Sequence, residues 1–290
     1  MIGLEVKKNY IFFLKGRTMK IHKVGFISIV VASVFPAALF ATTNTALRFD
    51  GVNDYGTVLN DAALSPQVDG QITLSTWVKF DALPVGDNAV PVSKGSAFAY
   101  EYATGIWTNG EISYCLWRPT GSNYALAKGG VLTTGQWHNI TGTFMQDQYI
   151  KVYLDGHLAH QSSSFNSPLG SGNSDLYFGM IGGDPFTKSW FNGALDDVSL
   201  WNFAMTDSQV QQLVNTSLTG SESGLVAYWN FNEGSGQVVT DMTGHGHNGT
   251  LGSNPTAFDS ADPTWVAGVP EPATLAMLGL GAVMLRRKYS

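Results

Sequence analysis

The chain of 290 residues contains a single cysteine, Cys115. One thiol cannot form an intrachain disulfide, so a fold of this length must be held by its core and its hydrogen bonds. We interpret Cys115 as a small buried hydrophobe rather than a reactive thiol.

Basic residues are scarce away from the two ends of the chain. Between Ala41 and Val269 lie only seven of the 16 Lys and Arg residues, but 20 of the 22 Asp and Glu residues. Nucleic acids and anionic membrane surfaces need basic patches, so both are excluded as expected partners. Asp dominates the acids, which suits tight turns and oxygen-rich loops of the kind that bind calcium.

The C-terminal apolar run is too short to cross a membrane comfortably. The run 273–285 would form a helix about 20 Å long, whereas the hydrocarbon core of a bilayer is about 30 Å thick. Pro270, Glu271 and Pro272 precede this run, and Arg286 opens a basic cluster after it. The tail is therefore either a weak anchor or a sorting signal that is read and removed.

The N-terminal region carries an export signal. Residues 19–41 combine a basic start, an apolar core and small residues near Ala41, which is typical of a secretory signal peptide. Residues 1–18 are either an extended basic region or the product of an upstream start codon. We therefore assign residues 1–41 to the signal peptide.

The C-terminal layout of "VPEP", a short apolar stretch and "RRK" resembles the PEP-CTERM sorting segment of Gram-negative bacteria. The resemblance implies that residues 267–290 form a sorting segment with a short transmembrane helix. It also implies that an exosortase of the inner membrane recognises Pro270, Glu271 and Pro272. The mature protein would then reach the cell surface or the extracellular matrix.

Alternation of apolar and polar residues dominates the middle of the chain and predicts short antiparallel strands. One expected buried face in residues 71–80 consists of Ile72, Leu74, Thr76, Val78 and Phe80. Residues 150–154 continue the pattern with Ile150, Val152 and Leu154, and Asp155-Gly156 then signals a hairpin turn.

Two further segments have a readable pattern. In residues 195–201 we expect Val198 and Leu200 on one face of a strand, with Leu195, Ser199 and Trp201 on the other. Thr206 and Gln209 form a capping box that predicts one short helix, because Val210 and Leu213 then share a face.

Five segments in order resemble the LamG-like jelly-roll family, whose fold is the concanavalin A-like sandwich. They are "LRFDGVNDYGTVLN", "ITLSTWVKF", "GQWHNITGTFMQDQYIKVYLDGHLAH", "FNGALDDVSLWNFAMTDSQVQQL" and "GLVAYWNFNEGSGQVVTDMTGHGHNGTL". The resemblance implies an all-β antiparallel jelly-roll sandwich over residues 45–266. In such domains the last segment often comes first, so residues 224–266 either complete this sandwich or begin a second repeat.

A calcium site is the best candidate metal site. Asp50, Asn53 and Asp54 lie in one tight loop whose oxygen atoms suit Ca2+. The family resemblance implies that Asp196 and Asp197, in the "LDDV" strand, lie close to this loop. The alternative is that the two loop carboxylates only accept hydrogen bonds from their own turn.

Glycan binding is the second candidate. Aromatic faces stack on sugar rings, and Trp107, Tyr114 and Trp117 lie in glycine-rich or strand segments without clear core periodicity. His245 and His247 could bind a transition metal, although a solvent-facing loop is the favoured interpretation.

No catalytic residue is predicted. The chain has neither a G-x-S-x-G elbow nor an H-E-x-x-H motif, and its few glutamates lack the spacing of sandwich glycosidases. We therefore expect a non-catalytic glycan-binding or adhesion protein, assisted by calcium. The alternatives are a polysaccharide-active glycosidase or lyase, and a purely structural matrix protein.

Overall fold

The computed structural model describes most of the chain between its two terminal segments. It describes residues 13–14, 17–18, 44–86, 88–96, 99–117, 124–163, 172–182 and 189–270. The chain divides into two units, Met1–Phe40 and Ala41–Ser290. In the first unit, β1 (Phe13–Leu14) pairs antiparallel with β2 (Arg17–Thr18). The core of the expected signal peptide and the chain from Glu271 onward, including the expected C-terminal helix, lie outside the described residues.

Among the residues that the structure describes, no helix has the length and apolarity needed to cross a membrane.

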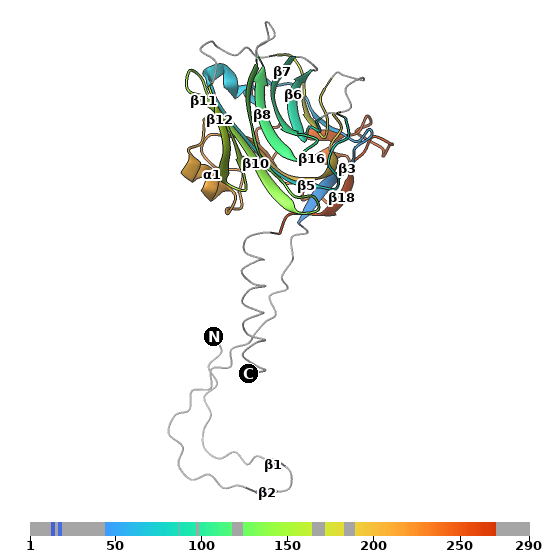
Figure 1. Cartoon of the computed structure of the whole chain (residues 1–290). Coiled ribbons are helices and arrows are strands. Elements are labelled where there is room, and N and C mark those ends of the chain that lie inside the picture. Colours follow the sequence, from blue (N-terminus) through green and yellow to red (C-terminus); the bar gives the residue numbers. More distant parts are fainter. Residues whose placement is uncertain are drawn as a thin grey trace. The chain divides into compact units, whose positions relative to one another are not determined.

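In the second unit, the described residues form two antiparallel sheets of eight strands each, which face each other in Figure 1. The order in the first sheet is β12-β11-β10-β5-β14-β3-β18, and β15 also pairs with β14. These strands are β12 (His157–Ser162), β11 (Tyr149–Leu154), β10 (Trp137–Met145), β5 (Gln71–Phe80), β14 (Asn192–Trp201), β3 (Thr45–Asp50), β18 (Thr264–Ala267) and β15 (Leu225–Trp229).

The second sheet has the order β16-β17-β4-β13-β6-β7-β8-β9. Its strands are β16 (Val238–Val239), β17 (Gly249–Leu251), β4 (Gly56–Val58), β13 (Leu176–Phe178), β6 (Val92–Ser96), β7 (Ala99–Ile106), β8 (Glu111–Trp117) and β9 (Tyr124–Val131). The expected all-β antiparallel sandwich is confirmed.

Two-residue alternation places the core between the sheets, as predicted. All five residues of the expected face of β5, from Ile72 to Phe80, are buried. In β11, Ile150 and Val152 are fully buried, and Leu154 packs against the same core. The alternating residues of β5 and β11 thus contribute to one contiguous apolar cluster between the sheets. The opposite face is buried in part as well, because Thr73 and Tyr153 are fully buried.

A bulge in β14 corrects one strand prediction. The pairing of β14 with β5 shifts between Asp196 and Ser199, and Asp197 has a φ of 48°. The extra residue puts Leu195 in the core together with Val198, although strict alternation assigned the two side chains to opposite faces.

The local turn and cap signals were correct. Asp155-Gly156 joins β11 to β12 with positive φ at both residues, as a two-residue hairpin turn requires. The helix α1 (Asp207–Leu213) begins with the predicted capping box between Thr206 and Gln209. In Figure 1 this helix lies beside β12 at one edge of the first sheet.

The chain from Gly224 onward completes both sheets. β15 extends the first sheet through β14, whereas β17 extends the second through β4. Trp229 is buried, with its ring in edge contact with Phe178 at 5.2 Å between centroids. This segment is therefore part of the same sandwich rather than the beginning of a second repeat.

Candidate functional site

The second sheet carries a groove on the face turned away from the core, with about 220 Å³ of open space. Strands β7, β8 and β9 form its floor. Its described lining is mostly apolar and aromatic, including Val90, Trp107, Cys115, Trp117, Tyr124 and Leu126. This groove is called the aromatic groove below.

Alternation along β8 decides which residues reach the aromatic groove. Ser113, Cys115 and Trp117 line it, whereas Tyr114 points between the sheets and is fully buried. A Cβ added to Gly142 would lie 2.0 Å from the Tyr114 ring, so this glycine makes room for it. Tyr114 is therefore out of reach of a sugar in the groove, whereas Trp107 and Trp117 line it.

The aromatic rings of the groove are held in place. Trp117 stacks on Tyr124, with centroids 5.4 Å apart and ring planes 13° from parallel. At the other end, Trp107 donates a hydrogen bond from Nε1 to Ser113 Oγ at 3.0 Å. Lys128 Nζ lies 4.1 Å from the centroid of the Trp107 ring, a cation–π distance.

Sequence reasoning missed Tyr124 and Ser113, which line the groove, and Lys128, which lies over the Trp107 ring. Their placement depends on the register of β8 with β9, which sets Trp117 opposite Tyr124 and Ser113 opposite Lys128. One signal could have suggested the stacked pair: Trp117 is the last residue of β8 and Tyr124 is the first residue of β9, so an aromatic residue stands on each side of the connection.

Cys115 lies on the floor of the aromatic groove but is chemically inert. Burial raises the pKa of its thiol to about 12, and Sγ lies 3.7 Å from the carbonyl oxygen of Ala103. The thiol therefore stays protonated at neutral pH and is a poor nucleophile.

The acidic loop between β3 and β4 uses its carboxylates within the turn. Asp50 Oδ1 accepts hydrogen bonds from the amides of Val52 (2.7 Å) and Asn53 (3.2 Å), while Asp54 Oδ2 accepts one from the Asp50 amide (2.8 Å). Burial raises the pKa of Asp54 to about 6, and the neighbouring charges of Asp50 and Asp262 add to this effect.

The acidic loop is close to a second acidic turn, residues 259–262. Asn53 Nδ2 donates to the carbonyl oxygen of Ser260, and Tyr55 N donates to that of Ala261 at 3.1 Å. Oδ1 of Asp262 is buried and has no hydrogen-bond partner among the residues that the structure describes. Within the described ranges, however, no three His, Cys, Asp or Glu residues are arranged so that they could hold a metal ion.

Asp196 and Asp197 are not brought to the acidic loop. The register pairs Asn192 with Asp50 and Leu195 with Leu47, so the two aspartates lie roughly 13 Å or more along the strand from Asp50. The Asp196 carboxylate is 1% exposed and accepts hydrogen bonds from the amides of Asp197 (2.9 Å) and Val269 (2.8 Å).

Asp197 instead faces the α1 side of the first sheet. Its Oδ1 accepts a hydrogen bond from the hydroxyl of Tyr228, and it borders a cavity of about 20 Å³ with Ser75 and Asn139. This volume is enough for about one water molecule.

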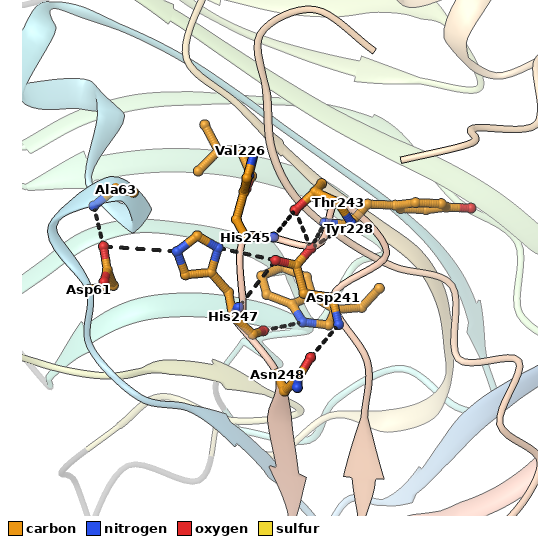
Figure 2. Close-up of polar contacts among 10 residues, drawn as sticks. Asp61, Ala63, Val226, Tyr228, Asp241, Thr243, His245, His247 and Asn248 are labelled. Carbon is orange, nitrogen blue, oxygen red and sulfur yellow. Dashed lines mark hydrogen bonds and ion pairs between the residues drawn. The ribbon is translucent and has the colours of Figure 1, made fainter. Parts of the chain in front are cut away.

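A histidine pair borders a shallow hollow of about 540 Å³ near the start of β15 (Figure 2). His245 is exposed, as expected, and its Nδ1 lies 2.9 Å from the carbonyl oxygen of Val226. His247 differs from the expectation, because only 9% of it is exposed. Figure 2 shows its ring between the carboxylates of Asp241 and Asp61, at 3.2 and 3.9 Å.

The environment of His247 indicates a structural ion pair. The Asp241 carboxylate raises the pKa of His247 more than burial lowers it, and the pKa of Asp241 is in turn held well below its usual range. The same carboxylate accepts hydrogen bonds from the amides of Tyr228 and Thr243. It thereby ties the turn between β16 and β17 to β15.

Two family models match the chain. The model described as the concanavalin A-like lectin/glucanases superfamily matches residues 50–211, more than half of the chain. The model described as the PEP-CTERM protein-sorting motif matches residues 268–288. None of the curated proteins matches this chain.

Solved structures are similar to this chain at low sequence identity. A protein of Bacteroides ovatus named as a candidate carbohydrate-binding protein has a TM-score of 0.58 and 20% identity, over 78% of this chain and 60% of its own. A SAP-like pentraxin of Limulus polyphemus has a TM-score of 0.46 and 17% identity, over 60% and 82% of the two chains. A sialidase of Trypanosoma rangeli has a TM-score of 0.43 and 17% identity, over 58% and 27%. At 20% identity the likeness to the Bacteroides ovatus protein shows the fold alone.

Proposed function

The chain belongs to the concanavalin A-like lectin/glucanase superfamily, and we propose that it is an exported, non-catalytic protein that binds a glycan in its aromatic groove. The observation that supports this proposal is the pair of held indole rings, Trp107 and Trp117, at the two ends of a groove on one sheet. The Bacteroides ovatus relative, named for carbohydrate binding, agrees with it.

The chemistry of the groove suits sugar rings. Apolar ring faces of a sugar stack on indole and phenol faces, while its hydroxyls need nearby donors and acceptors. Ser113 Oγ, Asn88 and Lys128 Nζ supply polar atoms beside the aromatic rings. Stacking pre-formed between Trp117 and Tyr124 also lowers the entropy lost when a ligand binds.

The groove gives little support to a glycosidase or lyase. Glycoside hydrolysis commonly uses two carboxylates about 5–10 Å apart across the scissile bond. Among the described lining residues of the aromatic groove there is no Asp or Glu. Glu111, the nearest acid along β8, is paired with Lys128 at 2.9 Å.

The C-terminal sorting segment supports export. Val269 is buried and its amide is held by Asp196, whereas the next residue, Pro270, is exposed. The recognition sequence Pro270-Glu271-Pro272 thus begins at an exposed residue directly after a buried one. We infer that an exosortase of the inner membrane reads this sequence and that the protein then reaches the surface or matrix of a Gram-negative cell.

Replacing Trp117 by alanine tests the groove. We expect the full chain to bind a subset of polysaccharides on a glycan array, and Trp117→Ala to weaken binding of those glycans about fivefold or more, because a stacking face worth about 1 kcal/mol is lost. Isothermal titration with the array hits measures the change.

Trp137→Ala is the matched control for this experiment, because Trp137 lies in β10 of the other sheet. It should bind like the unchanged chain. Equal binding by Trp117→Ala, or no array hit with folded protein, would contradict the proposal. The second outcome would favour a structural matrix protein.

We also propose that the acidic loop takes up Ca2+, although only Asp50, Asn53 and Asp54 of the five expected residues lie there. The support is the contact of this loop with the turn 259–262, where the buried Oδ1 of Asp262 lacks a hydrogen-bond partner among the described residues. Burial raises the pKa of Asp54, and the charges of Asp50 and Asp262 add to this shift. A folded-state pKa above the unfolded value favours folding at low pH, and that contribution is lost as the pH rises through about 6.

A cation should offset this loss. Millimolar CaCl2 is therefore expected to raise the melting temperature of the full chain by a few degrees at pH 7.5 and by less at pH 5, as measured by differential scanning calorimetry. Asp54→Asn should abolish the difference. Equal melting temperatures with CaCl2 and with EDTA at pH 7.5 would exclude the site.

A further inference from the structure

A lysine, a glutamate and an asparagine meet between β6, β7 and the residues after β4, and none of the three lines the aromatic groove. Lys94 in β6 is fully buried and Glu101 in β7 is 3% exposed. Lys94 Nζ lies 2.6 Å from Glu101 Oε1 and 2.8 Å from Oδ1 of Asn60, just beyond β4. Ser174 contributes its carbonyl oxygen at 3.0 Å from the same Nζ.

Each member of this cluster has the chemistry of one participant in amide exchange. A buried lysine that has lost its proton is a nucleophile. A carboxyl group within about 2.6–3.2 Å can accept and return that proton. An asparagine amide is an acyl group with ammonia as its leaving group.

The lysine nitrogen and the amide carbon of Asn60 lie close together. Since the amide C=O bond is about 1.23 Å long, Nζ is within about 4 Å of Asn60 Cγ. The backbone on both sides is fixed: Asn60 N donates to Asp175 Oδ1 at 2.8 Å, and Lys94 lies within a paired strand. Holding two reactants in this way replaces a slow bimolecular encounter by an intramolecular step.

The amide nitrogen of Asn60, which would leave as ammonia, belongs to an exposed side chain. Asn60 is an exposed residue, and within the described part of the chain its Nδ2 makes no hydrogen bond. Glu101 is positioned by donors other than the lysine, namely Gln67 Nε2 at 2.5 Å and the Gly172 amide at 2.9 Å. Its carboxyl group is thus fixed beside Nζ, while ammonia has a path to solvent.

We propose that Lys94 and Asn60 form an intramolecular isopeptide bond, with Glu101 as the catalytic acid–base residue. The Lys94 ammonium gives a proton to the Glu101 carboxylate, and the amine electron pair forms the Nζ–Cγ bond. The Cγ–Nδ2 bond then breaks with its electron pair on nitrogen, which takes the proton from Glu101. The second proton of Nζ passes to Glu101 and on to the released ammonia, leaving an amide, an ammonium ion and the original carboxylate.

The bond would link the end of β4 to β6 across β13, which lies between them. A chain with one cysteine cannot reinforce an exported sandwich by an intrachain disulfide. An amide crosslink supplies the same constraint on the unfolded chain without oxidation.

Peptide mapping of the purified full chain by mass spectrometry tests the proposal. We expect one branched peptide that joins the segments around Asn60 and Lys94, with a mass lower than the sum of the two by one ammonia. Separate, unmodified peptides from folded protein would overturn it and leave Lys94–Glu101 as an ion pair only.

Three variants separate the crosslink from other losses of ammonia. A succinimide at Asn60 also loses ammonia, but it would persist in Lys94→Met, whereas the crosslink would not. Asn60→Asp should give the same branched peptide, by loss of water. Glu101→Gln should leave the two peptides separate, and formation of the branched peptide in this variant at an unchanged rate would remove the role assigned to Glu101.

Discussion

Trp229→Ala is expected to destabilise the protein by about 3–5 kcal/mol, as large buried aromatic residues do when they are truncated. Trp229 is fully buried, its ring contacts Phe178 edge-on, and its Nε1 donates to the carbonyl oxygen of His247 at 2.7 Å. Because typical domains have only about 5–15 kcal/mol of net stability, this loss should lower the denaturant midpoint of the whole sandwich in guanidinium unfolding followed by circular dichroism.

Two controls make this result specific. Trp229→Phe keeps most of the ring and should cost less, and Phe258→Ala removes an aromatic side chain that is 71% exposed, which should cost under about 0.5 kcal/mol. If Trp229→Ala left the main transition unchanged, the chain from Gly224 onward would be a separate appendage rather than the completion of both sheets.

Removing one member of the buried Lys94–Glu101 pair is expected to cost about 3–5 kcal/mol. Lys94→Met leaves the Glu101 carboxylate buried with Gln67 and Gly172 only, whereas Glu101→Leu leaves the Lys94 ammonium without its counter-charge. Each single variant therefore retains a charge or donor that water no longer solvates.

The double variant Lys94→Met/Glu101→Leu should cost less than the sum of the two single variants, because no uncompensated charge remains. Urea unfolding of all four chains gives the coupling free energy, expected to be about 0.5–3 kcal/mol. Additive costs would show that the two side chains do not depend on each other, in spite of the 2.6 Å contact.

Local patterns predicted the elements well. Three correct predictions each depend only on residues that are close together in the sequence. They are the alternating face of β5, the Asp155-Gly156 hairpin and the capping box of α1. Such features follow from backbone geometry and side-chain chemistry alone, so that a single sequence suffices.

Predictions that required two distant segments were less successful. Asp196 was expected near the acidic loop, but the register with β3 puts it beside Val269. Tyr114 was expected at a binding surface, but it fills the space that Gly142 leaves between the sheets. Register and bulges decide such contacts, and one bulge at Asp197 changes the face of the residues on one side of it.

The sequence by itself determined the class of this protein: alternating strands around one core, a family signature through the middle and a sorting motif at the end. Only the tertiary structure decided which aromatic residues line a groove and which three polar residues meet, since Asn60 and Lys94 are 34 positions apart. The reason is physical. Periodicity is a local property of the backbone, whereas a site depends on strand order and register, which the whole core selects together.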